Sequence, residues 1–199
     1  VASDEGMNRD NWQLFAELGW LSIPFAEEHG GFGGNIVDLS VVMEELGKGL
    51  VVEPYFPTVV LFGGLIKRAG NEAQQAEWLP RIIGGEVLGA FAYVERQSRF
   101  ALHDCQTTAA KSGDGYVLNG EKVVVFNGEQ ADYLVVLART SGDQSDHDGL
   151  SLFIVDAAAA GVSKMSYPMM DGQRVANITF TDVAVGADAL LGEEGNALS

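Results

Sequence analysis

The sequence predicts an α+β protein, with an all-helical domain first and an antiparallel β-barrel or sandwich domain second. Apolar residues recur at helical spacings through the first 85 residues. After that, short apolar runs alternate with polar or glycine-rich turns, which is typical of strands. We therefore predict a helical domain at residues 1–85 and a β-domain at residues 86–199. Ligand sites favour such junctions, so residues 85–128 are the first place to look for one.

Three helices are expected in the first 70 residues. Apolar pairs at helical spacing predict a helix over residues 10–18, with Gly19 as its stop. Residues 37–46 carry apolar side chains on one helical face and glutamates on the other, which predicts an amphipathic helix. A third helix is predicted from Pro57 to about Gly70, because proline suits a first helical turn.

A fourth helix follows and completes a small bundle. Asn71 resembles an N-cap residue with Gln74 at the N3 position, the pattern of a capping box. Proline removes a backbone hydrogen bond inside a helix, so we expect a kink or an interruption at Pro80.

The second domain is predicted to be built of strands and turns. Asn119 and Gly120 lie between two apolar runs, which favours a hairpin whose type I′ turn holds both residues. Five further strands are expected besides this hairpin. They are predicted over residues 88–94, 132–138, 150–155, 162–167 and 176–181.

Composition excludes several classes of partner. The chain has 12 basic and 28 acidic residues, and its net charge of −16 repels nucleic acid and anionic membrane surfaces. The single cysteine, Cys105, excludes an internal disulfide framework, and no Cys/His cluster has metal-ligand spacing. No apolar run approaches the roughly 20 residues of a membrane span. We expect a soluble cytoplasmic protein, and also a piece of a longer one, because the chain opens on Val1 and stops after a loop-like run.

Several residues that can carry chemistry have simpler explanations. The glycine cluster at residues 30–34 lacks the spacing of a dinucleotide fingerprint and the lysine of a P-loop, which favours a structural loop over a phosphate cradle. The acidic turn at residues 141–148 is most simply a solvated loop. His29, His103 and His147 are scattered along the chain. The residues by themselves indicate no catalytic triad and no paired-carboxylate site.

Four runs of sequence, in order along nearly the whole chain, carry a resemblance to a known family. They are LGWLSIPFAEEHGGFGG at residues 18–34, EWLPRIIGGE at 77–86, DGYVLNGEK at 114–122 and LLGEEG at 190–195. Together they resemble the acyl-CoA dehydrogenase family. The resemblance implies an N-terminal helical domain, a middle β-domain and a C-terminal four-helix domain. The last of these, which supplies the family's catalytic glutamate, is missing here, so no catalytic residue is expected in this chain.

The resemblance also implies flavin chemistry, with FAD as cofactor and an acyl-CoA thioester as substrate. The family's segment Thr-Glu-Pro-x-x-Gly-Ser-Asp falls on residues 94–101, and its segment aromatic-Ile-Thr-Asn-Gly falls on residues 124–128. Both segments touch the flavin in the family. The implied cofactor-binding residues are Tyr93, Val94, Glu95, Val124, Val125 and Phe126, and the implied substrate-binding residues are Arg99 and Phe100.

The chain departs from the family pattern mainly at this site. Val94 and Phe126 replace the two threonines, and Val124 replaces the aromatic residue. Each lost hydroxyl donor removes a hydrogen bond of roughly 0.5–1.5 kcal/mol. Two interpretations stay open: a divergent acyl-CoA dehydrogenase, or a non-catalytic or half-site subunit that works beside a homologous subunit. The run at residues 95–100 resembles the small subunits of pimeloyl-CoA dehydrogenases within the family.

Four side chains near these segments have competing explanations. Arg96 and Arg99 could hold a CoA phosphate or the FAD pyrophosphate by charge-assisted contacts, or form surface ion pairs. Phe100 and Phe126 are expected to fill space that the family leaves for ligand, the alternative being that both turn into the β-core.

Overall fold

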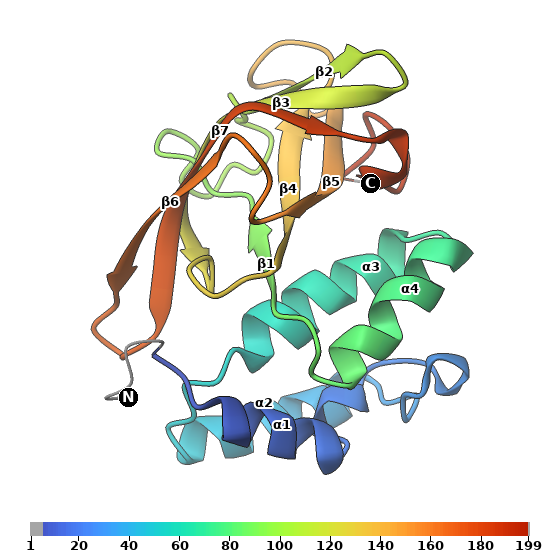
Figure 1. Cartoon of the computed structure of the whole chain (residues 1–199), viewed down its shortest axis with the longest axis vertical. Coiled ribbons are helices and arrows are strands. Elements are labelled where there is room, and N and C mark those ends of the chain that lie inside the picture. Colours follow the sequence, from blue (N-terminus) through green and yellow to red (C-terminus); the bar gives the residue numbers. More distant parts are fainter. Residues whose placement is uncertain (1–5, 199) are drawn as a thin grey trace.

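The computed structural model describes residues 6–198, and it stacks a helical part and a sheet part along the long axis of the molecule (Figure 1). The helical segments are α1 (Arg9–Glu17), η1 (Trp20–Ser22), η2 (Glu27–His29), α2 (Ile36–Lys48), η3 (Phe56–Gly63), α3 (Gly64–Ala69), α4 (Glu72–Ile83) and η4 (Ala187–Ala189). The strands are β1 (Gly89–Ala92), β2 (Thr108–Ser112), β3 (Gly115–Phe126), β4 (Tyr133–Arg139), β5 (Leu150–Asp156), β6 (Val162–Pro168), β7 (Arg174–Val185) and β8 (Leu190–Leu191). The predicted fold class is confirmed, whereas the boundary at residue 85 stays a prediction.

The four predicted helices are present, with two differences. The third begins as a π-helix, η3, and continues as α3. The fourth, α4, runs unbroken through Pro80, so the expected interruption is wrong. Its predicted capping box is confirmed, since Asn71 Oδ1 accepts from Gln74 N at 2.9 Å and Gln74 Oε1 accepts from Asn71 N at 3.1 Å. A good cap and a buried apolar face outweigh the one hydrogen bond that the proline removes.

The glycine cluster after η2 has a structural role. A side chain on Gly34 would place its Cβ only 2.6 Å from the carbonyl oxygen of Ile23, and one on Gly31 would meet the backbone of Phe25. Gly34 N also donates to Ile23 O at 2.8 Å. The glycines therefore let the loop close on itself, as the structural interpretation requires.

The sheet has the strand order β6-β7-β3-β2-β4-β5-β8, and β1 pairs with β4 outside that path. Most pairs are antiparallel. The exceptions are β1, which runs parallel to β4, and a single parallel bridge between Thr108 and Arg139. As a result β1 lies beside β4, a strand from much later in the sequence.

The predicted hairpin turn at Asn119 and Gly120 is wrong. Strand β3 runs straight through both residues, and the actual two-residue turn is Gly113-Asp114, between β2 and β3. Asn119 lies instead at a register shift between β3 and β7, where its side chain accepts from Asp182 N at 2.9 Å. The unpredicted strand β2 is mostly exposed and lacks an apolar alternation. Because β2 was not recognised, the hairpin turn was predicted at Asn119 and Gly120 instead of at Gly113 and Asp114.

Two apolar cores share the strands β4 and β5. Leu134 and Val136 of β4 point into the core inside the sheet, whereas Val135 and Leu137 pack with the helices. Side chains alternate across a strand, so a strand covered on both faces reads as a continuous apolar run. This explains why β4 has no polar face in the sequence.

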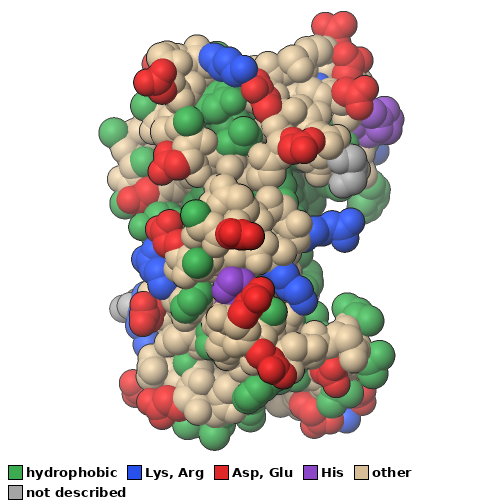
Figure 2. Space-filling view, turned by 90° about the vertical axis from the view of Figure 1, so that its right-hand side faces the viewer, with side chains coloured by type: hydrophobic (Ala, Val, Ile, Leu, Met, Phe, Trp, Pro, Cys, Tyr) green, Lys and Arg blue, Asp and Glu red, His purple; other side chains and the backbone are tan. Residues whose placement is uncertain are grey.

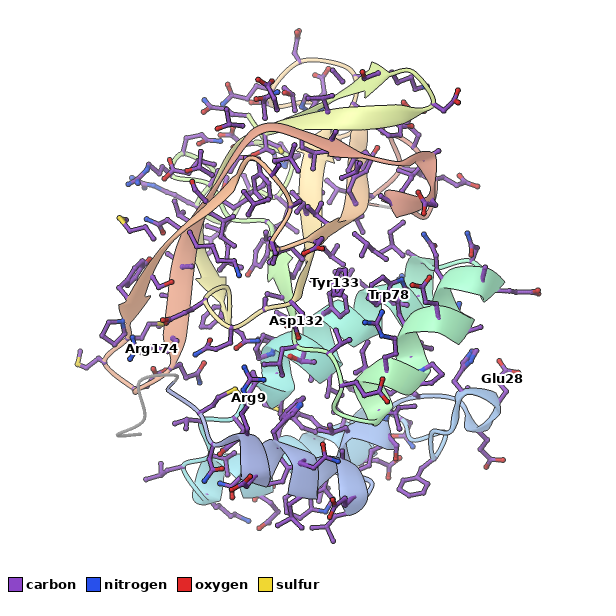
Figure 3. The ribbon with its side chains drawn as sticks, viewed as in Figure 1. Arg9, Glu28, Trp78, Asp132, Tyr133 and Arg174 are labelled. Carbon is purple, nitrogen blue, oxygen red and sulfur yellow. The ribbon has the colours of Figure 1, made fainter. Side chains whose placement is uncertain are left out.

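A few side chains attach the helices to the sheet. Trp78 of α4 meets Tyr133 at the start of β4 edge to face, with ring centroids 4.5 Å apart, and the two lie at the junction in Figure 3. Arg81 stacks on Trp78 at 4.8 Å. Gln74 Nε2 donates to the carbonyls of Asp188 and Leu190, at 3.0 and 2.9 Å. These contacts hold the β-domain in a defined position on the helices.

Candidate functional site

The two segments picked out by resemblance lie side by side in the structure. One is the end of β1 and the residues after it, and the other is the second half of β3. Val123 N donates to Val94 O at 2.8 Å, which joins the two backbones directly. The neighbouring residues of the two segments are also joined. Glu95 follows Val94, Lys122 precedes Val123, and Glu95 Oε1 forms an ion pair with Lys122 Nζ at 2.7 Å.

This ion pair is buried inside the β-domain. The side chains of Lys122 and Glu95 are 0% and 3% exposed. The other oxygen of the carboxylate accepts from Gln106 N and from Gln97 Nε2, both at 2.7 Å, and Oε1 also accepts from Thr107 N at 2.9 Å. A buried charge is tolerated when it is paired and fully hydrogen-bonded, as here.

The electrostatics follow from these contacts. Burial alone raises the pKa of Glu95, but the charge and the hydrogen bond of Lys122, with the donors on Thr107 and Gln97, lower that pKa to about 2. Cys105 lies against the pair, with Sγ 3.4 Å from Glu95 Oε1 and 3.5 Å from Lys122 Nζ. Burial raises the pKa of the Cys105 thiol to about 11.

The implied flavin-binding residues differ in what they can offer a ligand. Tyr93, Val94 and Phe126 are half-buried and Val124 is exposed, so these side chains reach the surface. Val125 points into the core of the sheet. Glu95 is buried too, and its carboxylate is used internally. The last two could reach a flavin only through their backbone.

Several backbone donors of the two segments are already occupied. Glu95 N donates to Ser98 Oγ at 3.0 Å, Val124 N to Asn177 Oδ1 at 3.1 Å, and Asn127 N to Arg174 O at 3.0 Å. The amides of Glu95, Val124 and Asn127 are therefore already used within the chain. The segments offer an apolar surface that suits an isoalloxazine ring, but they do not fit the donor set that the resemblance implies.

The implied substrate-binding residues lie on a turn after β1. Arg99 is exposed and has a φ of +47°, a left-handed conformation that is uncommon for non-glycine residues. Phe100 is 101% exposed, so it enters neither the β-core nor a cleft of this chain. Arg96 pairs with Glu121 at 3.1 Å on the surface, which is the surface-pair alternative for that residue.

Sequence reasoning missed three features of the site. Phe91 stacks on Tyr93 with centroids 4.7 Å apart, and so widens the aromatic surface. Val124 has a φ of +53° at a register shift between β3 and β7. The buried ion pair of Lys122 could have been predicted from the sequence, because a lysine within the apolar run of a strand must reach solvent or find a buried partner.

The acidic turn at residues 141–148 is exposed, but it wraps around a buried arginine. Arg139 donates to backbone carbonyls on both sides of the loop and on the neighbouring segment, those of His103, Cys105, Ser141, Gln144, Asp146 and Asp148. The rings of His103 and His147 stack at 4.0 Å across the same contact. Within residues 6–198, no group of three or more His, Cys, Asp or Glu side chains could hold a metal ion.

The surface of the molecule is rich in acidic side chains, as the net charge of the sequence predicts. Figure 2 shows acidic side chains spread over one whole face, and the outline is notched between the sheet above and the helices below. Across the described part of the chain, no helix is both long and apolar enough to cross a membrane.

The chain matches two family domains in succession. The acyl-CoA dehydrogenase N-terminal domain matches residues 1–86, and the acyl-CoA dehydrogenase middle domain matches residues 90–183. The long-chain specific acyl-CoA dehydrogenase of Rattus norvegicus mitochondria is 33% identical over 195 residues, which cover 94% of this chain and 45% of that protein.

Solved structures agree with these sequence matches. An acyl-CoA dehydrogenase from Geobacillus kaustophilus is 32% identical, with a TM-score of 0.87, over 96% of this chain and 52% of that one. Butyryl-CoA dehydrogenase from Megasphaera elsdenii is 30% identical, with a TM-score of 0.86, over 96% of this chain and 52% of that one. The chain thus spans about half the length of the relatives it matches. Its two matched regions follow the family order and cover most of its length, so the chain belongs to the acyl-CoA dehydrogenase family, of which it carries the N-terminal and middle domains.

Proposed function

We propose that this chain serves the FAD-dependent α,β-dehydrogenation of an acyl-CoA thioester, in a full-length protein or its complex, in the cytoplasm. The observation that carries the proposal is the side-by-side placement of residues 93–95 and 122–126, joined by the Val123–Val94 hydrogen bond. These are the segments that the family resemblance assigns to the flavin. The catalytic glutamate would come from the family's C-terminal domain, because general-base catalysis requires reach to the proton.

Within this proposal the chain's own residues would position and shield the cofactor. Tyr93, Val94, Val124 and Phe126 would form an apolar contact surface, and Arg99 and Phe100 would lie towards the acyl-CoA. A bound flavin would supply the redox chemistry, while the protein supplies orientation and excludes water. The hydrogen-bond donors of these segments do not fit the set that the resemblance implies, so within this proposal the chain's own residues carry no chemical step.

The misfit favours a second candidate function. Val94 and Phe126 offer no hydroxyl, and the amides of Glu95 and Val124 are occupied within the chain. A non-catalytic or half-site subunit of a heteromeric acyl-CoA dehydrogenase would tolerate these changes. The small subunit of pimeloyl-CoA dehydrogenase is the subfamily that the run at residues 95–100 resembles. A chain in the solved structure of the ChsE4–ChsE5 complex of Mycobacterium tuberculosis is 29% identical to this one over 94% of its length, with a TM-score of 0.86. The proposed partner is a homologous subunit.

An absorbance scan of the full-length protein distinguishes the two functions. Flavin bands in the purified protein would support the dehydrogenase, and their retention after gel filtration would exclude the degenerate site. Colourless protein that co-purifies with a homologous, yellow subunit would support the structural role.

A double variant tests whether the missing hydroxyls limit the flavin site. Val94→Thr with Phe126→Thr should increase FAD retention, because each regained hydrogen bond contributes roughly 0.5–1.5 kcal/mol. The matched control is Phe32→Thr with Val41→Thr, which changes the same residue types at exposed positions of the helical part. Equal flavin content in both folded variants would contradict the assignment of residues 94 and 126.

A further inference from the structure

Cys105, Lys122 and Glu95 form a cluster of reactive groups inside the β-domain that the proposed function does not use. Their exposed fractions are 2%, 0% and 4%. Cys105 follows the turn that carries Arg99, whereas Lys122 lies in the middle of β3. The cluster therefore joins a loop to a strand.

The thiol and the amine are within contact distance. Cys105 Sγ lies 3.5 Å from Lys122 Nζ. Among the described residues, no other lysine contacts this sulfur. Glu95 Oε1 lies 2.7 Å from the same nitrogen and 3.4 Å from the same sulfur, so one carboxylate oxygen faces both groups. The thiol's other neighbours, the carbonyls of Thr107 and Leu137, cannot react with it as nucleophiles.

We propose that Cys105 and Lys122 are a modification site, at which a hydroperoxide joins the two side chains in a sulfenamide cross-link. In the first step, hydrogen peroxide oxidises the thiol to a sulfenic acid and is itself reduced to water. In the second step, Nζ of Lys122 attacks Sγ, the S–O bond breaks and a second water leaves. The net change is the loss of two hydrogens from the protein, one from sulfur and one from nitrogen, and the formation of an S–N bond.

Proximity decides the fate of the sulfenic acid. Sulfenic acids condense with a neighbouring thiol or nitrogen, or else are oxidised further to sulfinic acid. A nitrogen held in contact with the sulfur has a large kinetic advantage over a second peroxide molecule from solution. The ammonium of Lys122 must lose a proton before its nitrogen attacks, and Glu95 Oε1 holds that nitrogen beside the sulfur.

Protonation sets the rate of the first step. Because the thiolate is the form that peroxide attacks, and burial raises the pKa of Cys105 to about 11, oxidation is slow at neutral pH. The rate should rise with pH as the thiolate fraction increases. Because Cys105 is buried, the first step requires a local opening of the segment around it before a peroxide molecule can reach the sulfur.

Peptide mapping of the peroxide-treated chain tests the proposal. The folded protein is treated with hydrogen peroxide at neutral pH and at about pH 9, unfolded, alkylated and digested with trypsin. Lysine that is cross-linked resists trypsin, so the expected product joins peptide 100–111, which contains Cys105, to peptide 112–139, which contains Lys122. It should be lighter than the two peptides together by two hydrogens, form faster at the higher pH, and separate again on treatment with dithiothreitol.

Two variants serve as controls. Cys105→Ser removes the sulfur and should give no linked product. The double variant Glu95→Gln with Lys122→Met removes the amine without leaving a buried charge, and its Cys105 should proceed to sulfinic acid. The proposal is overturned if wild-type Cys105 is recovered as an unmodified thiol, as sulfinic or sulfonic acid, or linked to any other residue. The wild-type result decides this even if a variant fails to fold.

Discussion

Replacing Lys122 by methionine should destabilise the β-domain strongly. The substitution keeps an unbranched apolar side chain in the same space but removes the charge that faces Glu95 at 2.7 Å. The carboxylate is then left in a site where its side chain is 3% exposed. It must either stay ionised without its cation or take up a proton, and both alternatives are unfavourable.

The magnitude follows from the pKa of Glu95. The pKa is lowered from 4.5 to about 2, against the effect of burial, by the charge and hydrogen bond of Lys122 and by other donors. At 1.36 kcal/mol per pKa unit, this shift corresponds to about 3 kcal/mol. Breaking a buried pair by removing one partner typically costs about 3–5 kcal/mol. We therefore expect Lys122→Met to lower the free energy of unfolding by about 3–5 kcal/mol.

Urea denaturation followed by far-ultraviolet circular dichroism measures this effect. The matched control is Lys111→Met, which removes the same charge from the exposed ion pair with Glu194 and should cost only about 0–1 kcal/mol. The double variant with Glu95→Gln should recover much of the loss, because no charge is left buried. If Lys122→Met were no more destabilising than Lys111→Met, the pair would not carry the stability that we assign to it.

Three further predictions concern acid stability, one glycine and catalysis. The folded pKa of Glu95 is depressed, so its stabilising contribution should be complete above the unfolded pKa of 4.5 and disappear as the pH falls towards 2; acid titrations in which Glu95→Gln lost stability as steeply as wild type would contradict this. Gly120→Ala should cost about 1–3 kcal/mol, because the new Cβ would lie 2.6 Å from Thr107 Oγ1 at a φ of +148°, whereas Gly47→Ala in α2, with open space around it, should be neutral or stabilising in the same denaturation assay. The 199-residue chain alone should not oxidise acyl-CoA with an artificial electron acceptor, since the family's base lies in a domain that this chain does not carry; turnover would contradict it.

The helical part could be predicted well because several local signals agreed there. Apolar spacing placed all four helices, and the Asn71 cap marked the start of α4 to the residue. The unbroken course of α4 through Pro80 could not be predicted, because it depends on Trp78, Leu79 and Ile82 being buried against the rest of the fold. Tertiary burial overrode a local helix breaker.

The sheet was less predictable because strand pairing is not local. Strand β2 holds small and polar residues that are mostly exposed, so it gave no periodic signal. Without it, Asn119 and Gly120 became the strongest turn candidate, although Gly120 is a glycine for another reason, its close approach to Thr107. A glycine within a strand can mark a bulge or a close backbone contact as well as a turn.

The candidate site was located only by resemblance, and the structure explains its shape through one irregularity in β3. In a regular strand, Lys122 and Val124 would share a face, yet Lys122 is fully buried and Val124 is 37% exposed. The register shift between Lys122 and Val125 breaks the alternation, and Val124 takes a left-handed φ of +53° there, which costs a β-branched residue roughly 1–2 kcal/mol. Because of this bulge, Lys122 can turn inward to Glu95 while Val123 still bonds to Val94, and Val125 returns to the core. The strained Val124 and the buried Lys122–Glu95 ion pair thus act together to hold side by side the two segments that the family resemblance assigns to the flavin, in a chain where Val94 and Phe126 carry no hydroxyl.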